Sequence, residues 1–286
     1  MVLRILFLLL AVGQLSQVVA QQKDAFVIYN QKGRKVNYKK LYRQVVQQDI
    51  VLFGEYHNNP IAHWLELELL QDLNADRDLA VGAEMLEADN QLAINNYFTG
   101  IIDQDGLDTM ARLWPNYPTD YAPLVDFAKA QQLPFIATNI PRRYASLVYR
   151  SGGFEALDEL KEYEKSWVAP LPIPFDPELP QYQNMLTMME GHGSPALVKA
   201  QAIKDATMAH FILQNYAAGS LFLHFNGSYH SDFHEGILWY LQQAEPDLNY
   251  LTITTVEQDD IYELDEEHRG RADFIICVDS DMTKTY

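Results

Sequence analysis

The alternation of short apolar runs with helical stretches constrains the fold more than any other feature of the sequence. Seven runs rich in Val, Ile and Phe are spaced along the chain, and most of them do not alternate apolar with polar residues. Runs of this kind are typical of strands that are buried on both faces. The stretches between them carry apolar residues at helical spacing, as Leu65, Leu69 and Leu73 do. This alternation predicts an α/β fold with a mostly parallel central sheet flanked by helices.

The predicted strands span residues 25–29, 50–53, 79–83, 134–137, 221–225, 250–254 and 274–278. The predicted helices span residues 38–47, 61–73, 121–131 and 195–216. Residues 154–195 have no strand signal and contain the proline-rich stretch APLPIPFDPELP, which cannot continue a helix. A charged helix, residues 155–167, is predicted before this stretch and a methionine-rich helix after it. We therefore expect one α/β domain, residues 21–286, with a helical cap insertion at about 154–195.

The first 20 residues have the layout of a secretory signal peptide. Arg4 gives a positive start, an apolar run follows, and small residues precede a predicted cleavage after Ala20. The alternative is a buried N-terminal helix. The signal peptide predicts an exported protein, periplasmic or at the cell surface. The one cysteine of the sequence, Cys277, lies far from the signal, so no lipidation cysteine follows it.

The composition excludes two classes of protein. A formal net charge of −18 repels polyphosphate, so nucleic acid is not an expected partner. A hydrophobic fraction of 48% suffices for a core and excludes a disordered chain. Cys277 lies in an apolar run and is predicted to be a buried structural thiol.

Polar residues gather where the second predicted strand meets a helix, in the segment VLFGEYHNNPIAH. Glu55 and His57 directly follow the buried run, and Pro60 fits the start of a helix that carries His63. Ligands of α/β proteins bind beyond the carboxyl ends of the strands, so these residues are candidates for a site. A helix-capping turn with satisfied polar groups is the alternative.

Three further strand ends carry unusual polar residues. They contribute Glu84, then Asn139 with Arg142 and Arg143, and then His224, Asn226, His230 and His234. Buried acids are costly unless they are paired, so Glu84 is expected to face a partner. Four such strand ends predict one shared cleft, which Glu55, His57, Glu84, His224 and His230 line.

A predicted helix adds Asp205, which shares a face with Gln201 and Met208. Asp205 could orient an imidazole or complete a metal shell. A surface aspartate beside Lys204 is the alternative.

Two kinds of chemistry fit these residues. Glu55, His57, His63 and His230 are suitable ligands for a divalent metal ion, and a glutamate could act as a general base in metal-dependent hydrolysis. The catalytic candidates in the cleft are Glu55, His57, Glu84, Arg142, Asp205 and His224. Arg142 also suits an acidic group, because a guanidinium can bind a carboxylate or phosphate bidentately. The second kind of chemistry is a pocket for a large planar cofactor, with Tyr182, Met185, Met188 and Met189 as an adaptable wall and His192 nearby. Plain core packing is the alternative for the methionines.

Six motifs occur in the order found in the ChaN-like haem-binding family: GEYHNNPIAH, EMLEADNQ with YFTG, WPNYPTDYAPLVDFA, IATNIPRR, AQAIKDATMA and LHFNGSYHSDFHEGI. From about residue 49 to residue 254 the chain thus resembles this family, which is related to Tiki-type metalloproteases and erythromycin esterases. The strand-end and helical motifs carry over as Glu55, His57, His63, Glu84, Arg142, Gln201, Asp205, His224 and His230. The sequence departs from the family at Ala62, where a second histidine is expected, and in having no lipidation cysteine.

The resemblance implies an α/β sheet with a helical cap and haem binding in bacterial iron acquisition. It also implies haem held between two subunits, a tyrosine as iron ligand, and outer-membrane haem-uptake machinery as a partner. The expected function is an exported haem-binding protein in haem or iron uptake or handling, with haem bound at the cap. The alternative is a metal-dependent hydrolase that uses the strand-end cleft.

Overall fold

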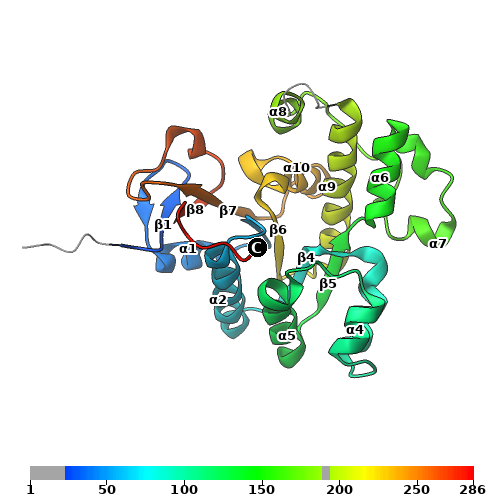
Figure 1. The fold of residues 1–286 in the computed structure, drawn as a ribbon, viewed down its shortest axis with the longest axis horizontal. Helices are drawn as coiled ribbons and strands as arrows, with labels where there is room; N and C mark the ends of the chain where they lie inside the picture. Colours follow the sequence, from blue (N-terminus) through cyan, green and yellow to red (C-terminus); the bar gives the residue numbers. More distant parts are fainter. Residues whose placement is uncertain (1–22, 189–193) are drawn as a thin grey trace, which may run out of the picture.

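The computed structural model describes residues 23–188 and 194–286, which form a central sheet with helices on both faces (Figure 1). The predicted signal peptide, residues 1–20, lies outside the described residues, and so do Met189 and His192. In the described part of the chain, no helix is long and apolar enough to cross a membrane.

The sheet has eight strands in the order β2-β1-β8-β7-β3-β6-β4-β5. The strands are β1 (Phe26–Asn30), β2 (Lys35–Val36), β3 (Ile50–Glu55), β4 (Leu79–Glu87), β5 (Phe135–Asn139), β6 (Leu221–Gly227), β7 (Tyr250–Gln258) and β8 (Phe274–Asp279). The six strands from β8 to β5 pair in parallel, and β1 pairs antiparallel with β2 and β8. The predicted mostly parallel α/β sheet is confirmed.

Helices of 4 to 21 residues cover the sheet. They are α1 (Tyr38–Val45), α2 (Pro60–Asp76), α3 (Gln91–Phe98), α4 (Gln104–Met110), α5 (Ala122–Gln131), α6 (Arg142–Ser151), α7 (Glu162–Lys165), α8 (Pro180–Met188), α9 (Pro195–Asn215) and α10 (Ile237–Ala244). Short helical turns are η1 (Ala88–Asn90), η2 (Tyr117–Tyr121), η3 (Phe154–Leu157), η4 (Ser228–His230), η5 (Asp232–His234) and η6 (Glu266–His268).

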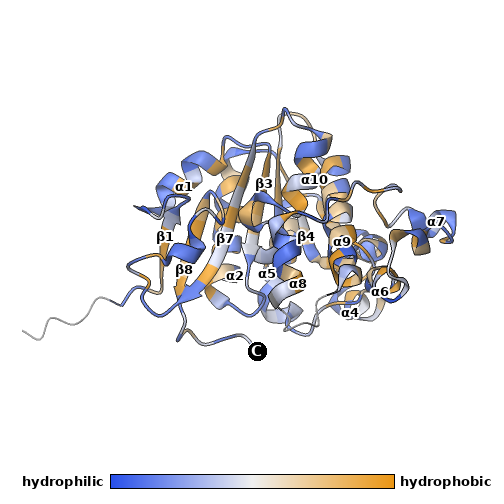
Figure 2. Cartoon of the chain, turned by 90° about the horizontal axis from the view of Figure 1, so that it is seen from above, coloured by the Kyte–Doolittle hydropathy of each residue, from blue (hydrophilic) through white to orange (hydrophobic). Residues whose placement is uncertain are grey.

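Each face of the sheet has its own core because strand side chains alternate between the two faces. Along β3, Val51 and Phe53 belong to the cluster that includes buried leucines of α1, α2 and α5. Ile50 and Leu52 belong to the cluster that includes buried residues of α6, α9 and α10. Figure 2 shows the hydrophobic colouring concentrated on strands such as β3 and β7, with hydrophilic residues on α1 and α7. This burial on both faces explains why the runs do not alternate in sequence.

The cap differs from the prediction. A continuous helix over residues 155–167 is wrong, because this segment forms η3 and the four-residue α7. Between η3 and α7 the backbone bonds between residues three apart, as the Leu160 N–H does to the Leu157 carbonyl at 3.2 Å. Leu157 is buried, but α7 buries no residue, so no apolar face stabilises a longer helix here. The predicted methionine-rich helix is confirmed as α8.

We expect Leu70→Ala to lower the free energy of unfolding by about 2–5 kcal/mol, because it opens a cavity between α2 and the sheet. Leu70 is fully buried, whereas Leu92 on α3 is 67% exposed and provides the matched control. Leu92→Ala should change the free energy by no more than about 0.5 kcal/mol. Urea denaturation followed by circular dichroism measures both. Equal effects of the two substitutions would contradict this core.

Candidate functional site

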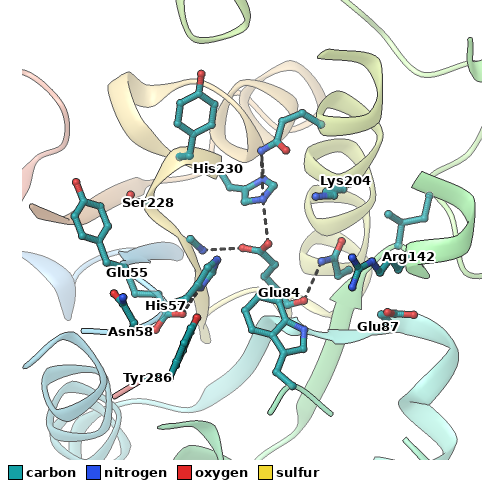
Figure 3. Close-up of a pocket in the computed structure, with 17 residues that line it drawn as sticks. Glu55, His57, Asn58, Glu84, Glu87, Arg142, Lys204, Ser228, His230 and Tyr286 are labelled. Atoms are coloured by element: carbon teal, nitrogen blue, oxygen red, sulfur yellow. Dashed lines mark hydrogen bonds and ion pairs between the residues drawn. The ribbon is translucent and has the colours of Figure 1, made fainter. Parts of the chain in front are cut away.

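The carboxyl ends of β3, β4 and β6 meet at a polar cleft with a volume of about 700 Å³. β3 contributes Glu55, β4 contributes Glu84, and η4 contributes His230. Arg142 of α6 and Lys204 of α9 line the opposite side (Figure 3). The predicted position of a site beyond the carboxyl ends of the strands is thus matched by a cavity.

Local sequence explains how the first group of side chains is positioned. The Asn59 side chain accepts from the backbone N–H groups of Ile61 (3.0 Å) and Ala62 (3.1 Å), and Pro60 begins α2. His63 therefore lies in the first turn of α2. Gly227 has to be small, because a Cβ there would lie 2.9 Å from the ring of His57.

The Glu55 carboxylate is the centre of this first group. Its Oε1 accepts from His57 Nδ1 (2.7 Å) and from the Tyr121 hydroxyl (2.8 Å), and its Oε2 lies 2.7 Å from His63 Nε2. His63 Nδ1 lies 3.6 Å from Asp120 on the far side. The Glu55 side chain is fully buried, whereas that of His57 is 33% exposed. Both residues line the cleft, and His57 is the more exposed of the two.

These contacts fix the charges of the first group. Burial raises the pKa of Glu55, but the hydrogen bond from His57 and the contact with His63 outweigh it and lower the pKa. Burial lowers the pKa of His57, but the hydrogen bond to Glu55 and the charge of Glu84 raise it. Behind them, burial and the charge of Glu55 raise the pKa of Glu66 well above its ordinary value. Glu66 is therefore a neutral acid in the core.

Glu84, His230 and Asp205 form the second group. Glu84 Oε1 lies 3.1 Å from His230 Nε2, and its Oε2 accepts from the Gly227 N–H at 2.7 Å (Figure 3). His230 Nδ1 contacts Asp205, whose other oxygen accepts from the Tyr182 hydroxyl at 3.0 Å. Asp205 is buried and orients an imidazole, which was one of the two predicted roles and excludes the surface alternative.

His230 carries a positive charge between two carboxylates. Burial lowers its pKa, but the charges of Glu84 and Asp205 raise it to about 9. Burial raises the pKa of Glu84, and the charge of His230 outweighs burial and lowers it. Both imidazole nitrogens are therefore engaged with carboxylates rather than open to a ligand.

His224 does not line the cleft, contrary to the prediction. β6 continues three residues beyond it, so His224 lies within the strand and is fully buried. Its ring bonds Thr138 (2.7 Å) and Asn226 (3.1 Å). Burial lowers its pKa to about 4, so it is a neutral structural residue. Asn139 does line the cleft and donates to the Glu84 carbonyl at 3.0 Å.

The cap residues predicted to hold a cofactor pack against α9. Tyr182 is buried with Val198 and Ala202, and Met185 lies beside them. Burial and the charge of Asp205 raise the pKa of Tyr182 far above its ordinary value. This geometry does not favour a phenolate ligand from Tyr182. His192 and Met189 lie outside the described residues and stay predictions.

The structure divides the predicted metal ligands between the two groups. Glu55, His57 and His63 belong to the first, and His230 belongs to the second. Within the described ranges, one group of three side chains has ligand atoms within 4.8 Å of one another. It consists of Asp265, Glu267 and His268, which lie outside the cleft.

Aromatic residues that the sequence did not single out also line the cleft: Tyr56, Trp114, Tyr229 and Tyr286. Trp114 meets the ring of His57 edge-on, with 4.8 Å between the ring centroids. It lies in the motif WPNYPTDYAPLVDFA, which could have indicated it. Tyr286 is held at the cleft by its neighbour Thr285, which donates to the Asn58 carbonyl at 3.0 Å, and no local pattern indicates this contact.

The structure thus defines an α/β protein with a polar cleft at the carboxyl ends of its strands. The model of the haem-binding uptake family, Tiki superfamily, ChaN, matches residues 41–241. This chain belongs to that family. No protein with a curated description matches the sequence significantly.

Solved structures share the fold at low sequence identity. A structure of ChaN from Campylobacter jejuni, described as showing cofacial haem binding, is 15% identical with a TM-score of 0.66, covering 88% of this chain and 96% of that one. A Bacillus cereus protein is 11% identical with a TM-score of 0.51, covering 84% and 90%. An erythromycin esterase mutant in its open conformation is 8% identical with a TM-score of 0.51, covering 91% and 98%. At these identities the likeness establishes the fold alone.

The charge on His230 predicts how stability depends on pH. Its folded pKa, about 9, exceeds its ordinary value of 6.5, so its contribution is present below pH 6.5 and lost as the pH rises through about 9. We expect the free energy of unfolding of the wild type to fall across this window, and His230→Gln to remove part of the fall. Urea denaturation at both ends of the window measures it.

The matched control is His210→Gln. Burial lowers the pKa of His210, so its own contribution to stability rises slightly, rather than falls, as the pH increases. The control should keep the fall of the wild type. An equal fall in His230→Gln would mean that His230 does not carry the charge.

Proposed function

We propose that this protein binds haem and serves in haem or iron uptake or handling outside the cytoplasm. The observation that carries the proposal is the match to the haem-binding uptake family over residues 41–241. The cofacial haem binding described for the structure of Campylobacter jejuni ChaN supports it through the shared fold. A homodimer around haem, and outer-membrane haem-uptake machinery as a partner, belong to the same proposal.

The ring and iron of haem require different protein groups from its propionates. An iron porphyrin needs an apolar surface for its ring and an imidazole, thiolate, thioether or phenolate for its iron. The polar cleft offers three carboxylates, Glu55, Glu84 and Glu87, which do not suit the ring. Arg142 and Lys204 suit an acidic group, such as a haem propionate. The cleft would thus hold a carboxylate rather than the iron.

A metal-dependent hydrolase in the cleft is not favoured. A catalytic metal needs about three protein ligands around one point, with an open position for water. The predicted ligands instead belong to two hydrogen-bonded groups, and both nitrogens of His230 are engaged. Measuring bound metals on the purified protein tests this alternative directly.

Export rests on the signal peptide of residues 1–20. We expect the native mature protein to begin at Gln21. Intact-mass spectrometry of the protein purified from its host gives the N-terminus. A mature protein that retains residues 1–20 would contradict the export proposal and leave haem binding untouched.

Titration with haemin tests haem binding. We expect the mature protein to shift and sharpen the Soret band of haemin, with saturation at a defined stoichiometry, because ligation and burial change the surroundings of the iron. Light scattering with and without haemin reports whether two subunits assemble. If the spectrum equals that of haemin in the same buffer without protein, at every protein concentration, haem binding by this chain is ruled out.

A further inference from the structure

A second cavity, of about 490 Å³, lies between α9, α10 and the segment of residues 169–174. It shares no lining residue with the polar cleft. Ala206, Ala209 and Tyr240 are buried at its walls, and Ile173 lines it from the segment before α8. A cavity of this size and apolar lining falls in the range of small-molecule and cofactor sites.

Helix α9 builds this cavity with one stripe of its surface. Ala206, Ala209, His210 and Leu213 follow the spacing that places residues on one helix face. Gln201 and Lys204, by contrast, line the polar cleft. The two alanines have small side chains, which leave room for a flat ring to lie against the helix. Polar residues occur at the rim, where Gln214 and Gln243 are exposed.

His210 sets this cavity apart from a packing gap. His192 lies outside the described residues, and five of the other histidines, His57, His63, His224, His230 and His234, contact polar or acidic side chains. His268 lines neither cavity. In the described part of the chain, His210 has an edge-on ring contact with Phe211 and no hydrogen bond or ion pair. Burial alone lowers the pKa of His210, which leaves a neutral imidazole.

We propose that haem binds in this apolar cavity, with His210 as the axial ligand of the iron. This inference rests on the proposed function. It assigns the ring and the iron ligand to one subunit, where the family resemblance implies haem between two subunits and a tyrosine ligand. A neutral imidazole is a ligand that haem iron accepts in many proteins, and an apolar wall suits the porphyrin ring.

Haemin binding to single variants tests this assignment. We expect His210→Ala to bind haemin at least about tenfold more weakly and to lose the Soret band of the wild type, since even an outer-shell partner of a metal ligand is worth that much. Added imidazole should restore the band, because it can occupy the space of the missing side chain. His234→Ala, which changes a histidine outside both cavities, is the matched control and should match the wild type.

Iron-free protoporphyrin separates ligation from occupancy of the cavity. His210→Ala should still bind protoporphyrin, followed by its fluorescence, because the apolar walls remain. Ala209→Phe should weaken the binding of both haemin and protoporphyrin, because it fills the cavity. Circular dichroism establishes that each variant is folded. A folded Ala209→Phe with unchanged affinity for both would overturn the assignment.

The outcomes distinguish this inference from the proposed function. If the wild type binds no haemin, the proposed function fails and this inference with it. If the wild type binds haemin and His210→Ala gives the same spectrum and affinity, only the assignment to His210 fails. A loss of the Soret band in His57→Ala would place the iron in the polar cleft, and a loss in Tyr182→Phe would place it at Tyr182; either result overturns the inference.

Discussion

The arrangement of side chains at the carboxyl ends of the strands follows from the free-energy cost of burying charged carboxylates there. Glu55 and Glu84 are both buried, and a buried carboxylate requires partners. Glu55 is paired with His57 and His63, and Glu84 is paired with His230. His230 in turn contacts Asp205, which accepts a hydrogen bond from Tyr182 in the cap. One requirement for charge compensation thus connects the sheet, α9 and α8, and the loss of a member leaves an unpaired group inside the protein.

Helix α9 joins two sites of opposite character. Near Gln201 and Lys204 it borders a cleft of carboxylates, imidazoles and cations, and near His210 it borders an apolar cavity. The two environments suit different parts of an amphipathic ligand. Polar groups would lose their hydration in the apolar cavity, whereas an apolar ring gains little free energy from the polar cleft. The same helix can therefore support a structural ion network and a cofactor pocket without competition between them.

The fold does not by itself assign the chemistry. An erythromycin esterase and ChaN of Campylobacter jejuni both share the architecture of this chain, at 8% and 15% identity. What distinguishes the functions that such a sheet can support is the set of groups at its carboxyl edge and their protonation. Here a charged His230 between two carboxylates and a neutral Glu66 behind Glu55 describe a stabilised ion network. Open coordination positions would require some of these contacts to break.

The sequence by itself determined the α/β class, the start of α2 at Pro60, and four of the five residues predicted to line the cleft, because these depend on local periodicity, capping and strand ends. Only the tertiary structure decided which polar residues reach the cleft. The sequence predicts that His224 lines the cleft, but β6 continues beyond His224 and the side chain is buried. Tyr286 is held at the cleft by contacts between segments more than 200 residues apart, and His210 lines a cavity made by three separate segments. Local patterns fix which face of one element is apolar, whereas the packing of distant elements fixes what each side chain meets.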